Sequence, residues 1–110
     1  MRLLLIDDDS LVRDSLADLL LRHGHDVVTA ESAEIGLVTF CRAAIDGVPF
    51  EAVVADLALH NFDGTKVIDR ILAVAPCTLT VLLSGETGIT GRTVAKPVRI
   101  DELRRALGED

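Results

Sequence analysis

The chain alternates between short apolar runs and longer segments in which apolar residues recur at helical spacing. Strands that alternate with helices form βαβ units, and such units place parallel strands in one sheet with helices over both faces. We therefore predict an α/β fold with a doubly wound, five-stranded parallel sheet. The predicted strands are Arg2–Ile6, Val27–Ala30, Ala52–Ala55, Thr80–Leu83 and Thr93–Ala95.

The predicted helices are bounded by residues that favour helix ends. Ser10 and Ser32 are the expected N-caps, because a serine hydroxyl accepts a hydrogen bond from the first helical turn. Glycine after the last apolar position favours a stop. The expected helices run from Ser10 to Gly24, from Ser32 to Gly47, from Thr65 (after a turn at 61–64) to Pro76, and onward from Asp101.

The connection between the fourth and fifth strands is too short for an ordinary helix. Only residues 85–92 separate the two runs, and Gly85, Gly88 and Gly91 are among them. A parallel crossover usually takes about a dozen residues or more, most often as a helix. Because glycine disfavours helix and a single turn is marginal, we predict that the fourth helix is reduced to a loop or one turn.

Length and composition predict a single domain over residues 1–110. Hydrophobic residues make up 49 % of the chain, which is enough for an aliphatic core. No apolar run approaches the roughly 20 residues that span a bilayer, so we expect no membrane segment and a cytoplasmic location. The formal net charge of −7 disfavours unassisted binding to nucleic acid. A divalent cation or a basic surface on a partner protein suits this charge better.

Candidate site residues directly follow the first, third, fourth and fifth predicted strands. They are Asp7 and Asp8 after the first strand, Asp56 after the third, Ser84 after the fourth and Lys96 after the fifth. Each alone has an ordinary explanation; the acidic run at 7–9, for example, suits a helix start. In a doubly wound sheet, however, the carboxyl ends of the strands share one crevice, and ligands bind there. We therefore predict that these side chains form one site.

The predicted site has the chemistry of phosphoryl transfer. Three carboxylates within a few ångströms repel one another unless some take up protons or a cation lies among them. Oxygen ligands with room for water favour Mg²⁺. Lys96 and Ser84 are suited to a phosphoryl group, and a carboxylate such as Asp56 can act as the nucleophile that forms an aspartyl phosphate.

The motifs at these positions resemble those of a known family. They are I-D-D-D at 6–9, V-V-A-D at 53–56, D-G at 63–64, L-S-G-E at 83–86 and A-K-P at 95–97. In this order they resemble the receiver domain of two-component response regulators, and the resemblance covers essentially the whole chain. It implies a flavodoxin-like fold with the sheet order 2-1-3-4-5.

The resemblance also implies the roles of the site residues. It implies that Asp56 accepts phosphate from the phosphohistidine of a histidine kinase or phosphotransfer protein. The reaction depends on Mg²⁺ and is catalysed, like the later dephosphorylation, by the domain itself. The implied metal ligands are Asp7, Asp8, Asp56 and the backbone carbonyl of Ala58. Ser84 corresponds to the hydroxyl switch residue and Lys96 to the lysine that contacts the phosphoryl group.

The chain departs from the family pattern near the fourth and fifth strands. Thr93 stands where the family usually has Tyr or Phe, and His60 stands where it often has proline; we expect an ordinary loop histidine there. With the shortened fourth helix, these changes leave open a phosphorylation-independent interaction module as an alternative. They also suggest a homodimer through the region of the fourth and fifth strands and the last helix, in a stand-alone receiver. The cognate kinase and the output do not follow from the sequence.

Other α/β classes fit the motifs less well. The segment Gly85–Thr93 has one residue too many between its outer glycines for a phosphate-binding P-loop, and Arg92 replaces the lysine. A phosphatase with an aspartyl phosphate favours a second acid at position 58, which is alanine. A dinucleotide site needs glycines where Asp7 and its neighbours stand.

Overall fold

The computed structural model describes residues 1–59, 62–84, 93–95 and 98–108. Five parallel strands form the main sheet in the order β2-β1-β3-β6-β7. Their bounds are β1 Arg2–Ile6, β2 Asp26–Ala30, β3 Ala52–Asp56, β6 Leu79–Ser84 and β7 Thr93–Ala95. This confirms the predicted flavodoxin-like α/β sheet and its order 2-1-3-4-5, because β6 and β7 are the predicted fourth and fifth strands.

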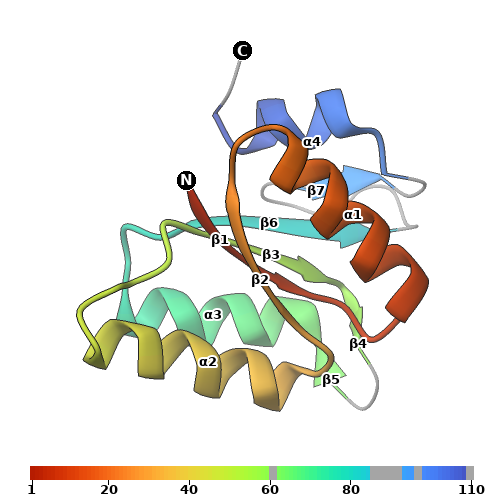
Figure 1. Ribbon diagram of the computed structural model, residues 1–110. Coiled ribbons are helices and arrows are strands. Elements are labelled where there is room, and N and C mark those ends of the chain that lie inside the picture. The colour runs from red at the N-terminus through yellow and green to blue at the C-terminus, as the bar shows by residue number, and fades with distance from the viewer. Residues whose placement is uncertain (60–61, 85–92, 96–97, 109–110) are drawn as a thin grey trace.

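The helices cover the sheet on both sides, as predicted (Figure 1). One layer contains α2 (Ala33–Ile45) and α3 (Gly64–Val74), and the other contains α1 (Ser10–Arg22) and α4 (Ile100–Ala106). The reduced fourth helix was predicted for residues 85–92, which lie outside the described residues.

Strand β1 shows why both layers are needed. Leu4 and Ile6 belong to the apolar cluster under α2 and α3, whereas Leu3 and Leu5 belong to the cluster under α1 and α4. Successive side chains of a strand point to opposite faces, so each of these four residues is wholly buried in one cluster or the other. A continuous apolar run at β1 therefore requires a helical layer on each side.

Two of the predicted helix ends are confirmed, and one predicted cap was wrong. Gly24 and Gly47 follow α1 and α2 with positive φ angles of 89° and 79°, a conformation that glycine adopts without strain. Ser32 caps α2 through its hydroxyl, which accepts from the amide of Ile35. Ser10, however, is the first residue of α1; the cap is Asp9, whose carboxylate accepts from the first-turn amides. Aspartate caps as well as serine, and it stands one residue earlier.

Two other boundaries also differ from prediction. The expected turn at 61–64 contains strand β5 (Phe62–Asp63), which pairs antiparallel with β4 (Ala58–Leu59). Strands of two residues are too short to show the alternating pattern that identifies a strand. The last helix begins at Ile100 rather than after Asp101, so that Asp101 and Glu102 occupy its first turn, where acids interact favourably with the helix dipole.

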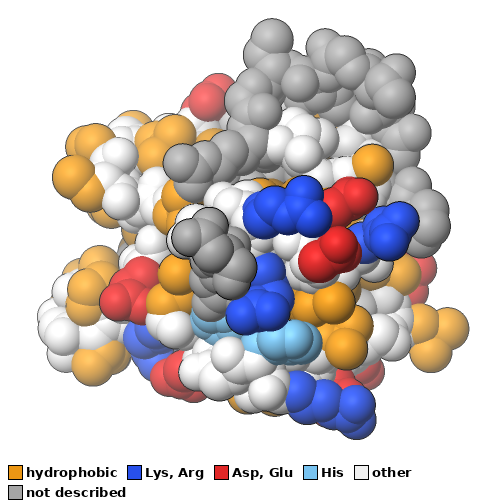
Figure 2. All heavy atoms as spheres, turned by 90° about the horizontal axis from the view of Figure 1, so that it is seen from above, with side chains coloured by type: hydrophobic (Ala, Val, Ile, Leu, Met, Phe, Trp, Pro, Cys, Tyr) orange, Lys and Arg blue, Asp and Glu red, His pale blue; other side chains and the backbone are white. Residues whose placement is uncertain are grey.

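The outer face of α1 and α4 mixes acidic and basic side chains (Figure 2). Ion pairs on these helices include Arg22 with Asp18 at 2.9 Å and Arg105 with Asp101 at 3.5 Å. Exposed pairs of this kind contribute little to stability, about 0–1 kcal/mol each. Among the helices described here, none is both long and apolar enough to cross a membrane.

Candidate functional site

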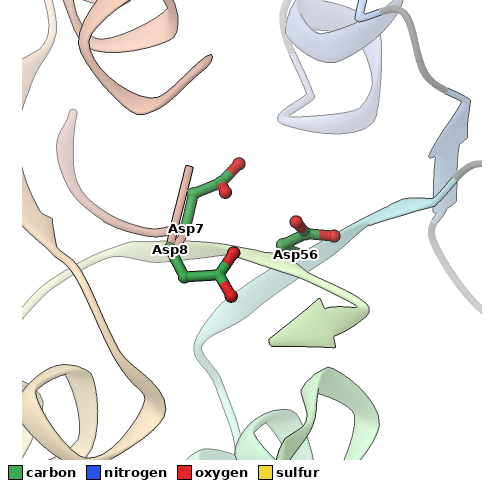
Figure 3. Close-up of side chains that lie close together, drawn as sticks. All are labelled: Asp7, Asp8 and Asp56. Atoms are coloured by element: carbon green, nitrogen blue, oxygen red, sulfur yellow. The ribbon is translucent and has the colours of Figure 1, made fainter. Parts of the chain in front are cut away.

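Three carboxylates meet at the carboxyl ends of β1 and β3. Asp7 and Asp8 directly follow β1, and Asp56 is the last residue of β3 (Figure 3). One oxygen from each of the three lies within 4.8 Å of the others. Asp7 and Asp56 are buried, while Asp8 is exposed to solvent. The convergence predicted from the strand ends is therefore confirmed for these three residues.

Backbone amides orient the two buried carboxylates. The amide of Asp9 donates to Oδ1 of Asp7 over 2.9 Å, and the amide of Ala58 donates to Oδ1 of Asp56 over 3.2 Å. Each bond joins a side chain to the amide two residues onward, as in an Asx-turn. The chain therefore turns away from the sheet immediately after each acid, which leaves the carboxylates at its edge.

Gly64 approaches the backbone of Asp56 too closely for any side chain. A Cβ atom at position 64 would lie 2.2 Å from the carbonyl oxygen of Asp56 and 2.8 Å from the Cα atom of Leu57. The amide of Gly64 also donates to the carbonyl of Leu57 over 2.8 Å. The first residue of α3 thus packs directly on the loop that carries Asp56. The D-G motif was noted in the sequence, but this role of its glycine was not predicted.

Arg13 is a second residue that sequence reasoning missed. Its side chain is only 16 % exposed, and Nη1 donates to the backbone carbonyl of Asp7 over 3.1 Å. The amide of Arg13 also donates to the carbonyl of Asp9 over 2.9 Å. An arginine in α1 therefore ties the first turn of the helix to the loop that carries Asp7 and Asp8.

Of the other predicted site residues, the structure describes Ser84 and Ala58. Ser84 ends β6 beside β3 and is buried, with Leu83 of the same strand opposite Asp56 in the sheet register. Ala58 lies in β4, two residues beyond Asp56, and its carbonyl remains a predicted metal ligand. Lys96 and His60 lie outside the described residues.

Asp63 is held as a helix cap beside the site. Its carboxylate accepts from the hydroxyl of Thr65 over 2.7 Å and from the amide of Thr65 over 2.8 Å. These bonds hold the pKa of Asp63 below its ordinary value. The stabilisation is present above the ordinary carboxyl pKa and is lost as the pH falls through the lowered pKa of the folded state.

An open hollow borders the exposed carboxylate. It has a volume of about 460 Å³ and is lined by Asp8, Glu31, Ser32, Ala33, Glu34, Ile35 and Phe62. It therefore lies between the N-terminal turn of α2 and β5. Asp8 is therefore open to solvent and solutes from this side.

The donor set fits a hard divalent cation. The cluster supplies only carboxylate oxygens, and its exposed member, Asp8, leaves room for water. Mg²⁺ prefers oxygen ligands and commonly retains several waters when one or two carboxylates bind it. Zinc sites in proteins usually use Cys or His ligands, and the cluster contains neither. An acidic cluster of this composition is consistent with Mg²⁺.

Comparison with known proteins identifies the family. Residues 3–107 match the family model described as the response regulator receiver domain. The chain belongs to this family. The domain is thus a receiver of the kind found in two-component systems, whose members bind Mg²⁺ at an acidic pocket and interact with histidine kinases or phosphotransfer proteins.

Individual relatives agree with this assignment. The response regulator FleR of Pseudomonas aeruginosa is 34 % identical over 93 residues, which cover 84 % of this chain and 18 % of FleR. The chain therefore spans less than a fifth of that relative's length. A receiver domain protein from Clostridium thermocellum has the same fold, with a TM-score of 0.86 at 23 % identity over 97 % of this chain and 90 % of that chain.

A third comparison concerns a protein whose structure contains ligands. The response regulator TrrA of Thermotoga maritima, solved in complex with Mg²⁺ and BeF, has a TM-score of 0.85 at 23 % identity. The match covers 97 % of this chain and 96 % of that chain. At this identity the likeness establishes the fold alone.

Proposed function

We propose that this receiver accepts a phosphoryl group on Asp56 in a Mg²⁺-dependent reaction and signals through protein contacts. The observation that carries the proposal is the cluster of three carboxylates within 4.8 Å at the carboxyl ends of β1 and β3. Like charges at this spacing raise the free energy of the folded state, and a bound cation offsets that repulsion. The Mg²⁺ and BeF complex of TrrA supports the same chemistry for a protein of this fold.

The transfer involves one bond formed and one bond broken. A carboxylate oxygen of Asp56 attacks phosphorus, the N–P bond of a donor phosphohistidine breaks, and its electron pair remains on the imidazole nitrogen. Water later attacks the same phosphorus, which releases inorganic phosphate and restores the carboxylate. In this proposal the domain catalyses both steps.

Each side chain has a defined part in the proposed reaction. Asp7, Asp8, Asp56 and the carbonyl of Ala58 hold the metal. When bound, Mg²⁺ supplies positive charge that offsets the charge on the transferring phosphoryl oxygens. The hydroxyl of Ser84 donates a hydrogen bond to a phosphoryl oxygen, and Lys96 contributes a further positive charge. The amide of Ala58 already holds Asp56 in one orientation, which favours attack along one direction.

The proposed partners and setting follow from the family. The phosphodonor is a histidine kinase or a histidine phosphotransfer protein, and the location is the cytoplasm. We propose no contact with nucleic acid or membrane, and residues 1–110 act as one receiver domain. A homodimer through β6, β7 and α4 remains a prediction. The phosphorylation-independent module is not favoured, because the acidic cluster is complete.

Intact-mass spectrometry after incubation with a small acyl-phosphate donor and Mg²⁺ tests the proposal. We expect one added phosphoryl group, which is absent from the Asp56→Asn variant and from a sample treated with a chelator. Asp69→Asn is the matched control, because Asp69 is an exposed acid on α3 and lies outside the cluster. If the wild type gains no phosphoryl group from this donor or from a phosphohistidine donor, and binds no Mg²⁺ at millimolar concentration, the proposal is wrong.

A further inference from the structure

Helix α2 carries apolar side chains on its outer face as well as its inner face. Gly36, Phe40 and Ala43 are buried against the sheet. On the other side, Ile35, Val38 and Ile45 are 44 %, 62 % and 85 % exposed. These are three of the eight large apolar residues that are exposed in the described part of the chain. A helix that covers a sheet ordinarily presents polar residues to water, so this outer face is typical of an interaction surface.

Charged residues are placed symmetrically around Val38. Glu34 lies four residues before it and Arg42 four residues after it, so the three side chains form one row along the helix. Both charged residues are exposed. Within residues 1–59, 62–84, 93–95 and 98–108, neither forms an ion pair. Within the helix, the row therefore reads acid, apolar, base, and it is followed by the exposed C-cap residue Asp46.

We propose that the outer face of α2 binds a second copy of this chain through the same face, with the two α2 helices antiparallel. A two-fold axis beside Val38 reverses the row in the second copy, so that each Glu34 lies next to the Arg42 of the other molecule. The charged residues stand about 6 Å along the helix on either side of Val38, at 1.5 Å per residue. Such a two-fold interface is isologous, which means that both copies use the same surface. The acid of each copy then faces the base of the other.

The geometry of helix packing is compatible with this arrangement. In the commonest class of packing, the rows of residues four apart on one helix fit the grooves between the same rows on the other. Leu37, Val38, Cys41, Arg42, Ile45 and Asp46 line a hollow of about 700 Å³ on this face. The hollow has room for the side chains of a second helix. The apolar contacts supply the affinity, and the two ion pairs set the antiparallel direction.

This surface is separate from the homodimer region predicted from the sequence. Helix α2 and helix α4 cover opposite faces of the sheet (Figure 1). Changes to α2 therefore leave β7 and α4 intact, and changes to α4 leave the α2 face intact. The proposal does not require phosphorylation, because it uses exposed residues of α2 and none of the three clustered carboxylates.

Charge reversal with sedimentation analysis tests the proposal. We expect a concentration-dependent dimer for the wild type across the micromolar range. Glu34→Arg alone and Arg42→Glu alone each replace both ion pairs by like-charge contacts, and each should weaken self-association by about tenfold or more. A one-to-one mixture of these two variants restores opposite charges and should sediment as a dimer. The double variant Glu34→Arg/Arg42→Glu should also dimerise.

Several results would overturn the proposal. A wild type that stays monomeric to millimolar concentration rules out the interface. If neither charge reversal changes dimerisation, or if only changes in α4 abolish it, the two copies are in contact through another surface. Loss of association in both single variants without recovery in the mixture or the double variant rules out the antiparallel pairing.

Disulfide trapping provides a second measurement that does not depend on charge. In a background with Cys41→Ser and Cys77→Ser, Val38→Cys places one thiol beside the two-fold axis in each copy. Mild oxidation should then yield a covalent dimer. Val74→Cys is the matched control, because Val74 on α3 is 63 % exposed, much like Val38 at 62 %. Equal cross-linking of the two variants would show random collision and contradict the proposal.

Discussion

At the amino ends of the strands the structure describes an ion pair between opposite charges, and at the carboxyl ends three carboxylates come together. At the amino ends of β1, β2 and β3, Arg2 donates from Nη1 to Asp26 over 3.1 Å and from its amide to Glu51 over 2.8 Å. At the carboxyl ends of β1 and β3, the carboxylates of Asp7, Asp8 and Asp56 lie within 4.8 Å of one another. Both ends are polar, and they belong to the same strands.

The difference separates stabilising polar residues from functional ones. Arg2 also donates from Nε to the carbonyl of Val48 over 2.9 Å, and its guanidinium lies 4.7 Å from the ring centre of Phe50. These contacts lower the free energy of the folded state and need no ligand to explain them. Three neighbouring carboxylates instead repel one another unless protons or a positive charge offset the repulsion. A function is therefore the better explanation of the carboxyl end, and variants at the two ends should affect different measurements.

The largest effect on phosphorylation among these variants is expected for Asp8→Asn. Asp8 is the exposed member of the cluster, so its amide variant should fold. We expect Mg²⁺ affinity and the rate of Mg²⁺-dependent phosphorylation to fall by about 100-fold or more, since even residues that only support a metal ligand typically matter 10- to 100-fold. Titration calorimetry with Mg²⁺ and intact-mass time courses measure the two quantities.

The same variant should gain less stability from Mg²⁺ than the wild type. A cation that binds the folded state stabilises it, so Mg²⁺ should raise the unfolding temperature more in the wild type than in Asp8→Asn. An equal rise in both proteins would contradict the assignment of Asp8 as a metal ligand.

Gly64→Ala should have the second largest effect. The added methyl group meets the backbone of Asp56 and Leu57, which cannot move without shifting the loop after β3. A displacement of 1 Å at a reacting group costs about 100-fold in rate, so a smaller shift should lower the rate of phosphorylation by about tenfold. Intact-mass time courses measure this rate.

Gly36→Ala is the matched control for this change. A Cβ atom there meets the side chain of Ile6 rather than backbone, with 2.4 Å to Cδ1. We expect each variant to lose about 1–3 kcal/mol of stability through overpacking, with the rate of phosphorylation preserved only in Gly36→Ala. Equal loss of rate in both variants would show that general destabilisation explains the effect.

The accuracy of the sequence predictions differed between residues for physical reasons. Asp7, Asp8 and Asp56 were predicted because the end of an apolar run fixes where a strand stops, and parallel strands stop at one edge. Asp9 was missed as the cap of α1 because it and Ser10 are both good caps.

Tertiary contacts were beyond the sequence. The close approach of Gly64 to Asp56 depends on how α3 docks on β3, which no local pattern records. Arg13 reads as an ordinary helical arginine until its bond to the carbonyl of Asp7 is seen. Periodic burial is thus readable from the sequence, whereas individual contacts between distant segments are not.

Arg13→Gln should have a smaller effect than Gly64→Ala. The change removes the bond from Nη1 to the carbonyl of Asp7 and leaves the cluster itself intact. The loss of one such bond is worth about 1 kcal/mol, so we expect Mg²⁺ affinity to fall by roughly fivefold. If Arg13→Lys binds Mg²⁺ as tightly as the wild type, the positive charge near the cluster explains the effect of Arg13. If Arg13→Lys shows the same fivefold loss of Mg²⁺ affinity, the directed bond from the guanidinium to the carbonyl of Asp7 explains it.

Arg2→Gln should leave phosphorylation unchanged and lower stability alone. The change removes a charged donor at the amino ends of the strands, far along β1 from Asp7. Bonds to Val48 and Asp26 and the contact with Phe50 are lost, so the free energy of unfolding should fall by about 1–2 kcal/mol. Urea denaturation measures the fall, and the intact-mass time course should match that of the wild type.

Arg22→Gln is the matched control, because it shows how much stability is lost when an exposed ion pair is removed. Arg22 forms a 2.9 Å ion pair with Asp18, but its side chain is 71 % exposed against 31 % for Arg2. Water screens the exposed pair, so its loss should cost less than about 0.5 kcal/mol. If Arg2→Gln were as mild as Arg22→Gln, the amino end would be an ordinary polar surface. If Arg2→Gln slowed phosphorylation, the two ends of the sheet would be coupled, and opposite charge would no longer distinguish a stabilising cluster from a functional one.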